Sequence, residues 1–196
     1  MITDINSLKN ISDKEFFDNF SYIMHVALIK DEGLYFDLID QMYEICERNE
    51  SVLDDVLNKC VKDIDIIKTK DIRYLEFGKA FSETLKLILG DKYTDGEYLS
   101  LGCVMASYIS YIRSWLTKDE YYEIRDMFVP FYLPISIEML DIDNAVNTFN
   151  KYIPVNENGK YTLALIKKVG KCVIDDSVSI DDITKAFNEI NFDEAW

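Results

Sequence analysis

The stretch that decides the fold is LEFGKAFSETLKLILGDKYTDGEYLSLG, residues 75–102. Apolar residues recur at helical spacing on both sides of Gly90, and glycine commonly ends helices. We therefore predict one helix from about Ile72 to Leu89. A second, long and apolar helix is expected from Gly96 to about Leu116, with Asp95 as its N-terminal cap.

Two glycines lie inside these predicted helices, at Gly78 and Gly102. Glycine within a helix costs roughly 1 kcal/mol relative to alanine. Their presence therefore indicates close helix packing, or a close backbone approach, at these two positions.

Helix signals continue towards the N-terminus. Ser12 and Glu15 have capping-box spacing before the apolar run FFDNFSYIMHVALI, residues 16–29. LYFDLIDQMYEICER, residues 34–48, has the apolar spacing of an amphipathic helix, and another helix is expected to start at Ser51.

The C-terminal side mixes helix and strand signals. A capping box at Thr117 starts a helix that must end near Pro130. A short helix is expected at about residues 143–152, a small β-hairpin near residues 160–174, and a last helix from Ser179. The predicted fold is mainly α: a single compact domain over residues 1–196 with about eight helices and one hairpin.

Composition bounds the class of protein. The chain has 196 residues, 48% of them hydrophobic, which is typical of an ordinary globular domain. No apolar run reaches the ~18 residues of a membrane span. No secretory signal precedes the first helix, and the four cysteines are too scattered for a metal or redox motif. We therefore expect a cytoplasmic protein with buried free thiols.

The formal net charge is −15. This charge repels phosphate backbones and anionic membrane surfaces, so neither nucleic acid nor membrane is an expected partner. It leaves room for a basic protein partner.

Most catalytic motifs are absent. The chain has no G-x-G-x-x-G or Walker loop to hold phosphates, and no G-x-S-x-G elbow. The single histidine, His25, lies between Met24 and Val26. These apolar neighbours favour a packed, hydrogen-bonded core histidine over a catalytic one.

Two segments resemble a known family. LEFGKAFSETLK (75–86) and DGEYLSLGCVM (95–105) are similar to the motifs L-N-F-G-H-T-F-G-H-A-I-E and H-G-E-A-V-A-x-G-M of 3-dehydroquinate synthase, a sugar phosphate cyclase. Residues 8–36, Leu133-Pro134 and GKYTLALIKKVGK (159–171) resemble further family segments in the same order. The resemblance covers nearly the whole chain and implies the helical, metal-binding C-terminal half of such an enzyme.

In that family a separate N-terminal half supplies NAD. One glutamate and two histidines bind a divalent metal, usually zinc or cobalt. The resemblance places these three ligand positions at Tyr22, Lys79 and Asp95. A protonated lysine cannot ligate a cation, and tyrosine is a poor zinc ligand at neutral pH. We therefore expect no metal, and no other cofactor, to bind this chain.

Other family positions are also changed. The second histidine of G-H-T-F-G-H falls on Glu83, the family lysine after A-E-V-I falls on His25, and the substrate-binding D-K-K falls near residues 153–155. One reading is a rebuilt Mg²⁺ or Ca²⁺ site of Glu83, Asp95 and Glu97. The other, which we favour, is an internal ion pair in which Lys79 and Glu83 meet in the space of the lost metal.

The sequence therefore predicts a degenerate 3-dehydroquinate-synthase-like domain. It would act as a partner, regulatory or structural domain without metal-dependent cyclase activity on its own. The alternative is the helical half of a divergent cyclase that works with a separate or missing NAD-binding half. An NAD-binding N-terminal half, another protein partner and a homo-oligomer all remain open as modes of association.

Overall fold

The computed structural model describes residue 8 and residues 11–192. Nine α-helices are bounded within this part of the chain, together with three short 3₁₀ helices. The helices are α2 (Asp13–Lys30), α3 (Glu32–Asp40), α4 (Met42–Cys46), α5 (Glu50–Lys70), α6 (Lys79–Leu89), α7 (Asp95–Ile112), α8 (Lys118–Asp126), α9 (Ile142–Tyr152) and α10 (Ile180–Ile190). The 3₁₀ helices are η1 (Ile72–Glu76), η2 (Gly90–Lys92) and η3 (Val129–Phe131). The mainly helical fold predicted from the sequence is confirmed.

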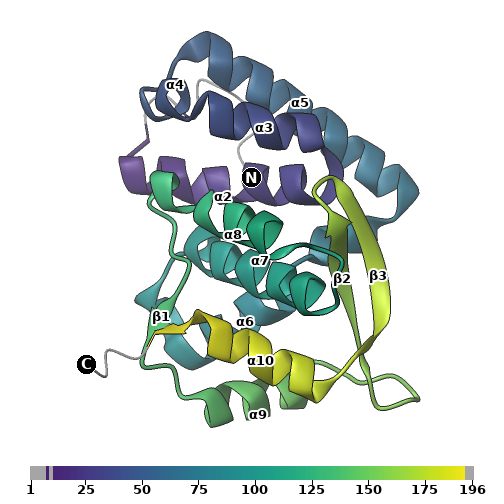
Figure 1. The fold of residues 1–196 in the computed structure, drawn as a ribbon. Coiled ribbons are helices and arrows are strands. Elements are labelled where there is room, and N and C mark those ends of the chain that lie inside the picture. Colours follow the sequence, from purple (N-terminus) through teal and green to yellow (C-terminus); the bar gives the residue numbers. More distant parts are fainter. Residues whose placement is uncertain (1–7, 9–10, 193–196) are drawn as a thin grey trace.

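The long helix α7 runs through the middle of the molecule (Figure 1). It packs against α2, α6, α8 and α10 and against the first strand of the hairpin, and most of its residues are buried. In the view of Figure 1, α3, α4 and α5 lie above it, while α6, α9 and α10 lie below. The core is therefore built around the apolar segment that follows Gly96.

Local capping sets most of the helix starts. Capping boxes open α2 at Ser12, α8 at Thr117 and α10 at Ser179, as predicted. For α7 the predicted cap is wrong: Thr94 is the cap and closes a box with Glu97, while Asp95 is already the first helical residue. A carboxylate in the first turn is still favourable, because it faces the positive end of the helix dipole.

Two predicted helices are interrupted. Residues 72–76 form the 3₁₀ helix η1, and the chain turns at Gly78, with φ +74°, before α6 begins at Lys79. The helix predicted over residues 34–48 is divided at Gln41 into α3 and α4. Apolar periodicity continues through both breaks, which is why spacing alone did not reveal them.

The β structure is small. β2 (Tyr161–Lys168) and β3 (Lys171–Val178) form the antiparallel hairpin predicted near residues 160–174. The hairpin extends a few residues further because β3 continues almost to the cap of α10. A second, two-residue parallel pair joins β1 (Ile137–Glu138) to β4 (Asn191–Phe192), and the sequence did not predict it.

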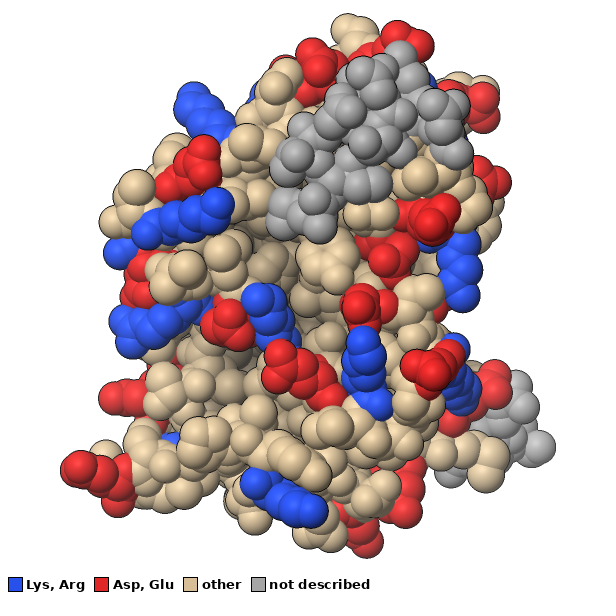
Figure 2. Space-filling model, turned by 180° about the vertical axis from the view of Figure 1, so that it is seen from behind, with Lys and Arg blue, Asp and Glu red and all other residues tan. Residues whose placement is uncertain are grey.

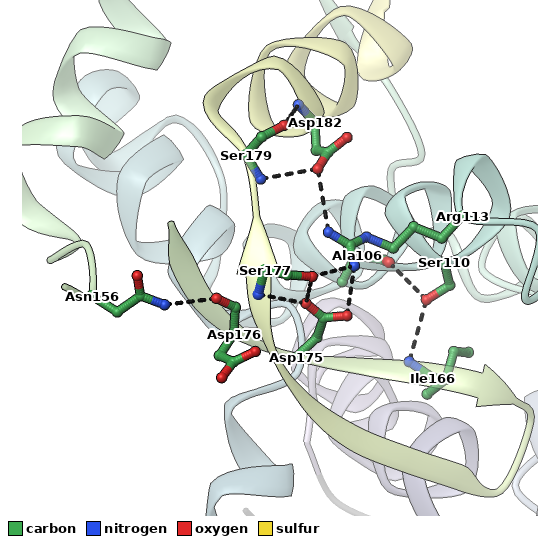
Figure 3. Close-up of polar contacts among 10 residues, drawn as sticks. All are labelled: Ala106, Ser110, Arg113, Asn156, Ile166, Asp175, Asp176, Ser177, Ser179 and Asp182. Carbon is green, nitrogen blue, oxygen red and sulfur yellow. Dashed lines mark hydrogen bonds and ion pairs between the residues drawn. The ribbon is translucent and has the colours of Figure 1, made fainter. Parts of the chain in front are cut away.

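One half-buried arginine ties the hairpin to the helices. Arg113 follows α7 and donates to Asp175 at 2.6 Å, to Ser177 at 3.0 Å and to Asp182 at 3.4 Å. Figure 3 shows its guanidinium between the end of β3 and the first turn of α10. Ser110 adds a second link, since its hydroxyl accepts the Ile166 N–H of β2. Together these contacts fix the hairpin against the end of α7.

All four cysteines are free thiols, three of them buried and Cys46 half-buried. Among the described residues, no helix combines the length and apolar character needed to cross a bilayer.

Candidate functional site

The positions that the family resemblance assigns to metal binding come together in one pocket. It has a volume of about 240 Å³ and lies where α2, α6 and the start of α7 meet. The lining residues are Tyr22, Lys79, Ser82, Glu83, Lys86, Asp95 and Leu99. Three positions far apart in the sequence, Tyr22, Lys79 and Asp95, therefore lie around the same space.

Backbone contacts set the shape of this pocket. Gly78 and Gly102 touch each other, and a Cβ at Gly78 would lie 2.7 Å from the backbone nitrogen of Cys103. A Cβ at Gly102 would collide with the carbonyl of Gly78. The close approach predicted from these two glycines is confirmed, and it brings the N-terminus of α6 directly against α7.

His25 fixes the same corner from the side of α2. Its side chain is only 3% exposed, and Nε2 donates to the Phe77 carbonyl at 3.0 Å. Burial, and next the charge of Lys79, lower the pKa of His25 to about 4. The imidazole is therefore neutral at pH 7 and holds the turn before α6, as the core interpretation predicted. It does not line the pocket.

Lys79 pairs with a different carboxylate from the predicted one. Its ammonium lies 3.2 Å from Glu76, in the preceding 3₁₀ turn, and its side chain is 38% exposed. Glu83 is exposed and forms no ion pair with Lys79 among the described residues. The predicted Lys79–Glu83 contact is wrong, because α6 begins only at Lys79 and the chain before it folds back to offer Glu76.

A second ion pair crosses the pocket. Lys86, in the last turn of α6, pairs with Asp95 at the start of α7, and this contact raises the pKa of Lys86. Tyr22 lies close to both, since Asp95 raises its pKa and Lys86 opposes that effect, although burial is the largest cause of the upward shift. Sequence reasoning did not single out Lys86. The signal was its place seven residues after Lys79, which puts both lysines on one face of the helix.

Asp18 was also missed. Its carboxylate accepts the Gly96 N–H at 2.7 Å, and it contributes to the raised pKa of Tyr22. Gly96 leaves no space for a side chain here, because a Cβ would collide with the Asp18 carbonyl. Asp18 therefore anchors the N-terminus of α7 to α2. Its position one helical turn before Tyr22 was the available signal.

The carboxylates do not assemble into a rebuilt metal site. Glu97 accepts the Thr94 N–H at 2.7 Å in its capping box and lines a neighbouring pocket with Asp18. Asp95 is engaged by Lys86, which leaves Glu83 alone in its part of the pocket. Within residue 8 and residues 11–192, no three His, Cys, Asp or Glu side chains are placed to share a metal ion.

The residues present do not fit the metal of the family. Lys79 is an exposed ammonium in an ion pair, which offers no lone pair and repels a cation. Tyr22 has a raised pKa, so its phenol stays protonated at neutral pH and is a poor ligand. Only Asp95 retains an oxygen donor of the usual kind, and Lys86 occupies it.

The remaining family positions lie elsewhere. Ile153 follows α9, and Val155 forms an isolated β-bridge with Tyr161. None of residues 153–155 lines the pocket.

Comparison with known proteins gives a consistent result. A family model described as "3-dehydroquinate synthase C-terminal" matches residues 20–152. A 3-dehydroquinate synthase from Coxiella burnetii is 26% identical over 201 residues, covering 96% of this chain and 55% of the relative. One from Thermodesulfovibrio yellowstonii is 21% identical, covering 95% and 54%. The chain spans about half the length of the curated relatives it matches.

Solved structures share the fold. ValA, a 2-epi-5-epi-valiolone synthase from Streptomyces hygroscopicus solved with NAD⁺ and Zn²⁺, superposes with a TM-score of 0.82 at 19% identity. The superposition covers 95% of this chain and 54% of the ValA chain. A second similar structure is a 2-deoxy-scyllo-inosose synthase complexed with carbaglucose-6-phosphate, NAD⁺ and Co²⁺. Its TM-score is 0.74 at 16% identity, and the superposition covers 95% of this chain and 55% of that chain.

Proposed function

The chain belongs to the 3-dehydroquinate synthase C-terminal family, and we propose that it is a form of this domain without metal-dependent cyclase activity of its own. It would act through association, as a partner, regulatory or structural domain. The observation that carries this proposal is the pocket in which Tyr22, Lys79 and Asp95 stand at the ligand positions implied by the family resemblance.

The charge arrangement in this pocket supports the proposal. Both lysines that line it are in ion pairs: Lys79 with Glu76 in the preceding 3₁₀ turn, and Lys86 with Asp95. A divalent cation would have to displace Lys86 from Asp95 and approach the Lys79 ammonium, and both steps oppose binding. Acidic and basic side chains are mixed over the back of the molecule (Figure 2).

A second candidate function follows from the length of the chain. It is the helical half of a divergent cyclase that needs a separate or missing NAD-binding half, and the coverage of about half of each relative supports it. Such an enzyme would still need metal chemistry, so metal binding separates the two candidates.

The test is a zinc titration of the protein by calorimetry at pH 7. We expect no specific binding tighter than about 0.1 mM, because lysine and protonated tyrosine do not ligate zinc. The matched control is the triple variant Tyr22→Glu, Lys79→His, Asp95→His, which restores the ligand types of the family. It should bind zinc at least about a hundredfold more tightly.

One zinc per wild-type chain, lost in Asp95→Asn, would overturn the proposal and favour the second candidate. If the triple variant failed to bind zinc although it remained folded, the pocket would not be the equivalent of the family metal site. Circular dichroism of each variant shows whether the fold is retained.

A further inference from the structure

A hollow larger than the pocket around Tyr22 lies on another part of the molecule. It has a volume of about 480 Å³ and is bounded by α3 and α4 on one side and by α8 and η3 on the other. Its apolar lining includes Phe36, Ile39, Met42, Met127, Pro130 and Phe131. A smaller hollow of about 160 Å³ shares Phe36 and Glu123 with it, so the two form one groove between α3 and α8. Figure 1 shows both helices on the side of the molecule facing the reader.

Large apolar side chains are exposed along this groove. Phe36 is 52% exposed and Ile39 is 41% exposed on its α3 side. Tyr43 and Val129, beside the groove residues Met42 and Pro130, are exposed as well. A cluster of exposed apolar residues is typical of an interaction site rather than of an ordinary surface. Methionine side chains adapt to the shape of a partner, which suits Met42 and Met127 to such a site.

The charged residues that line the larger hollow are all acidic. The larger hollow is lined by Asp40, Glu123 and Asp126 and by no basic residue. Asp126 pairs only with its sequence neighbour Arg125, and among the described residues Asp40 and Glu123 form no ion pair. The edge therefore presents carboxylates whose charge is largely uncompensated.

Two of these carboxylates stand where the fold itself disfavours them. Asp40 is the last residue of α3, and Asp126 is the last residue of α8. The C-terminal end of a helix carries a partial negative charge, so a carboxylate there is locally unfavourable. A cation from outside the chain would offset this cost at both helix ends.

We propose that this groove binds one amphipathic helix of a partner protein. Large apolar side chains of that helix would lie between α3 and α8, while Lys or Arg residues on its flanks would face Asp40 and Asp126. This is a helix-in-groove mode of recognition. The proposal rests on the partner role proposed above and specifies the chemistry of the partner.

Size and charge both favour this occupant. The nine residues of α3 span about 13 Å, which matches two to three turns of a helix lying alongside. A second copy of this chain would bring its own charge of −15 to an acidic groove, and this like charge opposes self-association. A basic helix is attracted by this negative charge.

The probe is a synthetic 14-residue peptide with Leu at spacings of three and four and Lys at the flanking positions. A matched peptide carries Glu in place of Lys. We expect the Lys peptide to bind and to shift the NMR methyl signals of Met42 and Met127, while the buried core residue Met105 stays unchanged. The Glu peptide should bind at least about tenfold more weakly.

Variants localise the binding. Asp40→Lys should weaken it by at least about threefold, whereas Glu157→Lys, which changes the net charge equally in an exposed turn far along the chain, should leave it unchanged. Ile39→Ser should weaken binding, and Leu87→Ser, at a leucine on α6 that is even more exposed, should not. Asp40→Lys removes an unfavourable charge from a helix end, so it is expected to fold.

Three outcomes would overturn the proposal: no binding of the Lys peptide, equal weakening by Asp40→Lys and Glu157→Lys, or shifts confined to residues outside the groove. Concentration-dependent shifts of Met42 and Met127 without peptide would identify a second copy as the occupant instead. The zinc titration does not involve this groove. If the peptide does not bind, the proposal that this chain binds no metal is unaffected. If zinc binds, the proposal that the groove binds a helix is unaffected.

Discussion

At Gly102 the backbone of α7 touches the carbonyl of Gly78, and neither glycine has room for a side chain. Gly102→Ala should therefore force α6 and α7 apart and lower the free energy of unfolding by about 1–3 kcal/mol, the usual cost of overpacking. Urea denaturation followed by circular dichroism measures this change.

A matched glycine separates collision from backbone strain. Gly90 has φ +62°, but a Cβ there meets nothing within 4 Å. With ψ −127° this backbone lies outside the left-handed helical region, so Gly90→Ala should cost the ~1–3 kcal/mol of a strained backbone without moving α6 from α7. If Gly102→Ala left the free energy of unfolding unchanged, the backbone contact would not be as tight as described.

His25 makes stability depend on pH. Its pKa is about 4 in the folded protein and about 6.5 in the unfolded chain, mainly because it is buried. Between these two values the unfolded chain takes up a proton that the folded protein does not. Above pH 6.5 His25 therefore does not lower the free energy of unfolding. As the pH falls from 6.5 to 4, its protonation in the unfolded chain lowers that free energy by up to about 3 kcal/mol.

The measurement compares wild type with His25→Gln, which cannot titrate and can still donate to the Phe77 carbonyl. The comparison is necessary because Asp63 acts in the opposite sense over a similar range. Burial and the charge of Asp31 raise the pKa of Asp63 to about 6, so its protonation favours the folded state. Wild type should lose more stability than His25→Gln between pH 6.5 and 4. Parallel curves for the two proteins would contradict the low pKa of His25.

At the scale of whole elements, buried and exposed ion pairs should behave differently. Arg113 joins α7, β3 and α10, and the side chain of its partner Asp175 is only 9% exposed. Arg113→Met would leave that carboxylate unpaired and should destabilise the protein by about 3–5 kcal/mol. Thermal and urea unfolding measure the loss.

The control is Lys86→Met. The side chains of Lys86 and Asp95 are both more than half exposed, so this pair is screened by water. Its removal should therefore destabilise the protein far less than Arg113→Met does. Equal losses in the two variants would show that Arg113 does not connect the three elements as the structure indicates.

Elements set by local chemistry could be predicted from the sequence. The helix starts at Ser12, Thr117 and Ser179 each depend on a side chain and a backbone N–H three residues apart, and a pattern of that range is visible in the chain. The break before Lys79 depends instead on contact with Gly102, far along the sequence. The pair β1–β4 likewise joins segments about fifty residues apart, which no local pattern reports.

The site was predicted only in part, for the same reason. Family motifs pointed to Tyr22, Lys79 and Asp95, and the structure brings these positions to one pocket. Their partners could not be read from helical spacing. Glu76 reaches Lys79 only because residues 72–76 form a 3₁₀ turn, and Lys86 reaches Asp95 only because η2 brings the end of α6 back towards α7.

At the scale of the whole molecule, charge and apolar surface are distributed unevenly. The back of the molecule mixes acidic and basic side chains (Figure 2), whereas the groove between α3 and α8 combines exposed apolar residues with carboxylates alone at its larger end. A net charge of −15 speeds encounter with any basic partner, and the groove gives such a partner a specific place to bind.

The corner around Gly78 also bears on how such a protein can change over time or be redesigned. Its geometry depends on main-chain atoms: the two glycine backbones, the Phe77 carbonyl and the Gly96 amide. The side chains that face the cavity are a separate set of positions. His25 and Asp18, which hold two of these atoms, do not line the pocket either, so its lining residues can be exchanged one at a time without removing the contacts that set its shape.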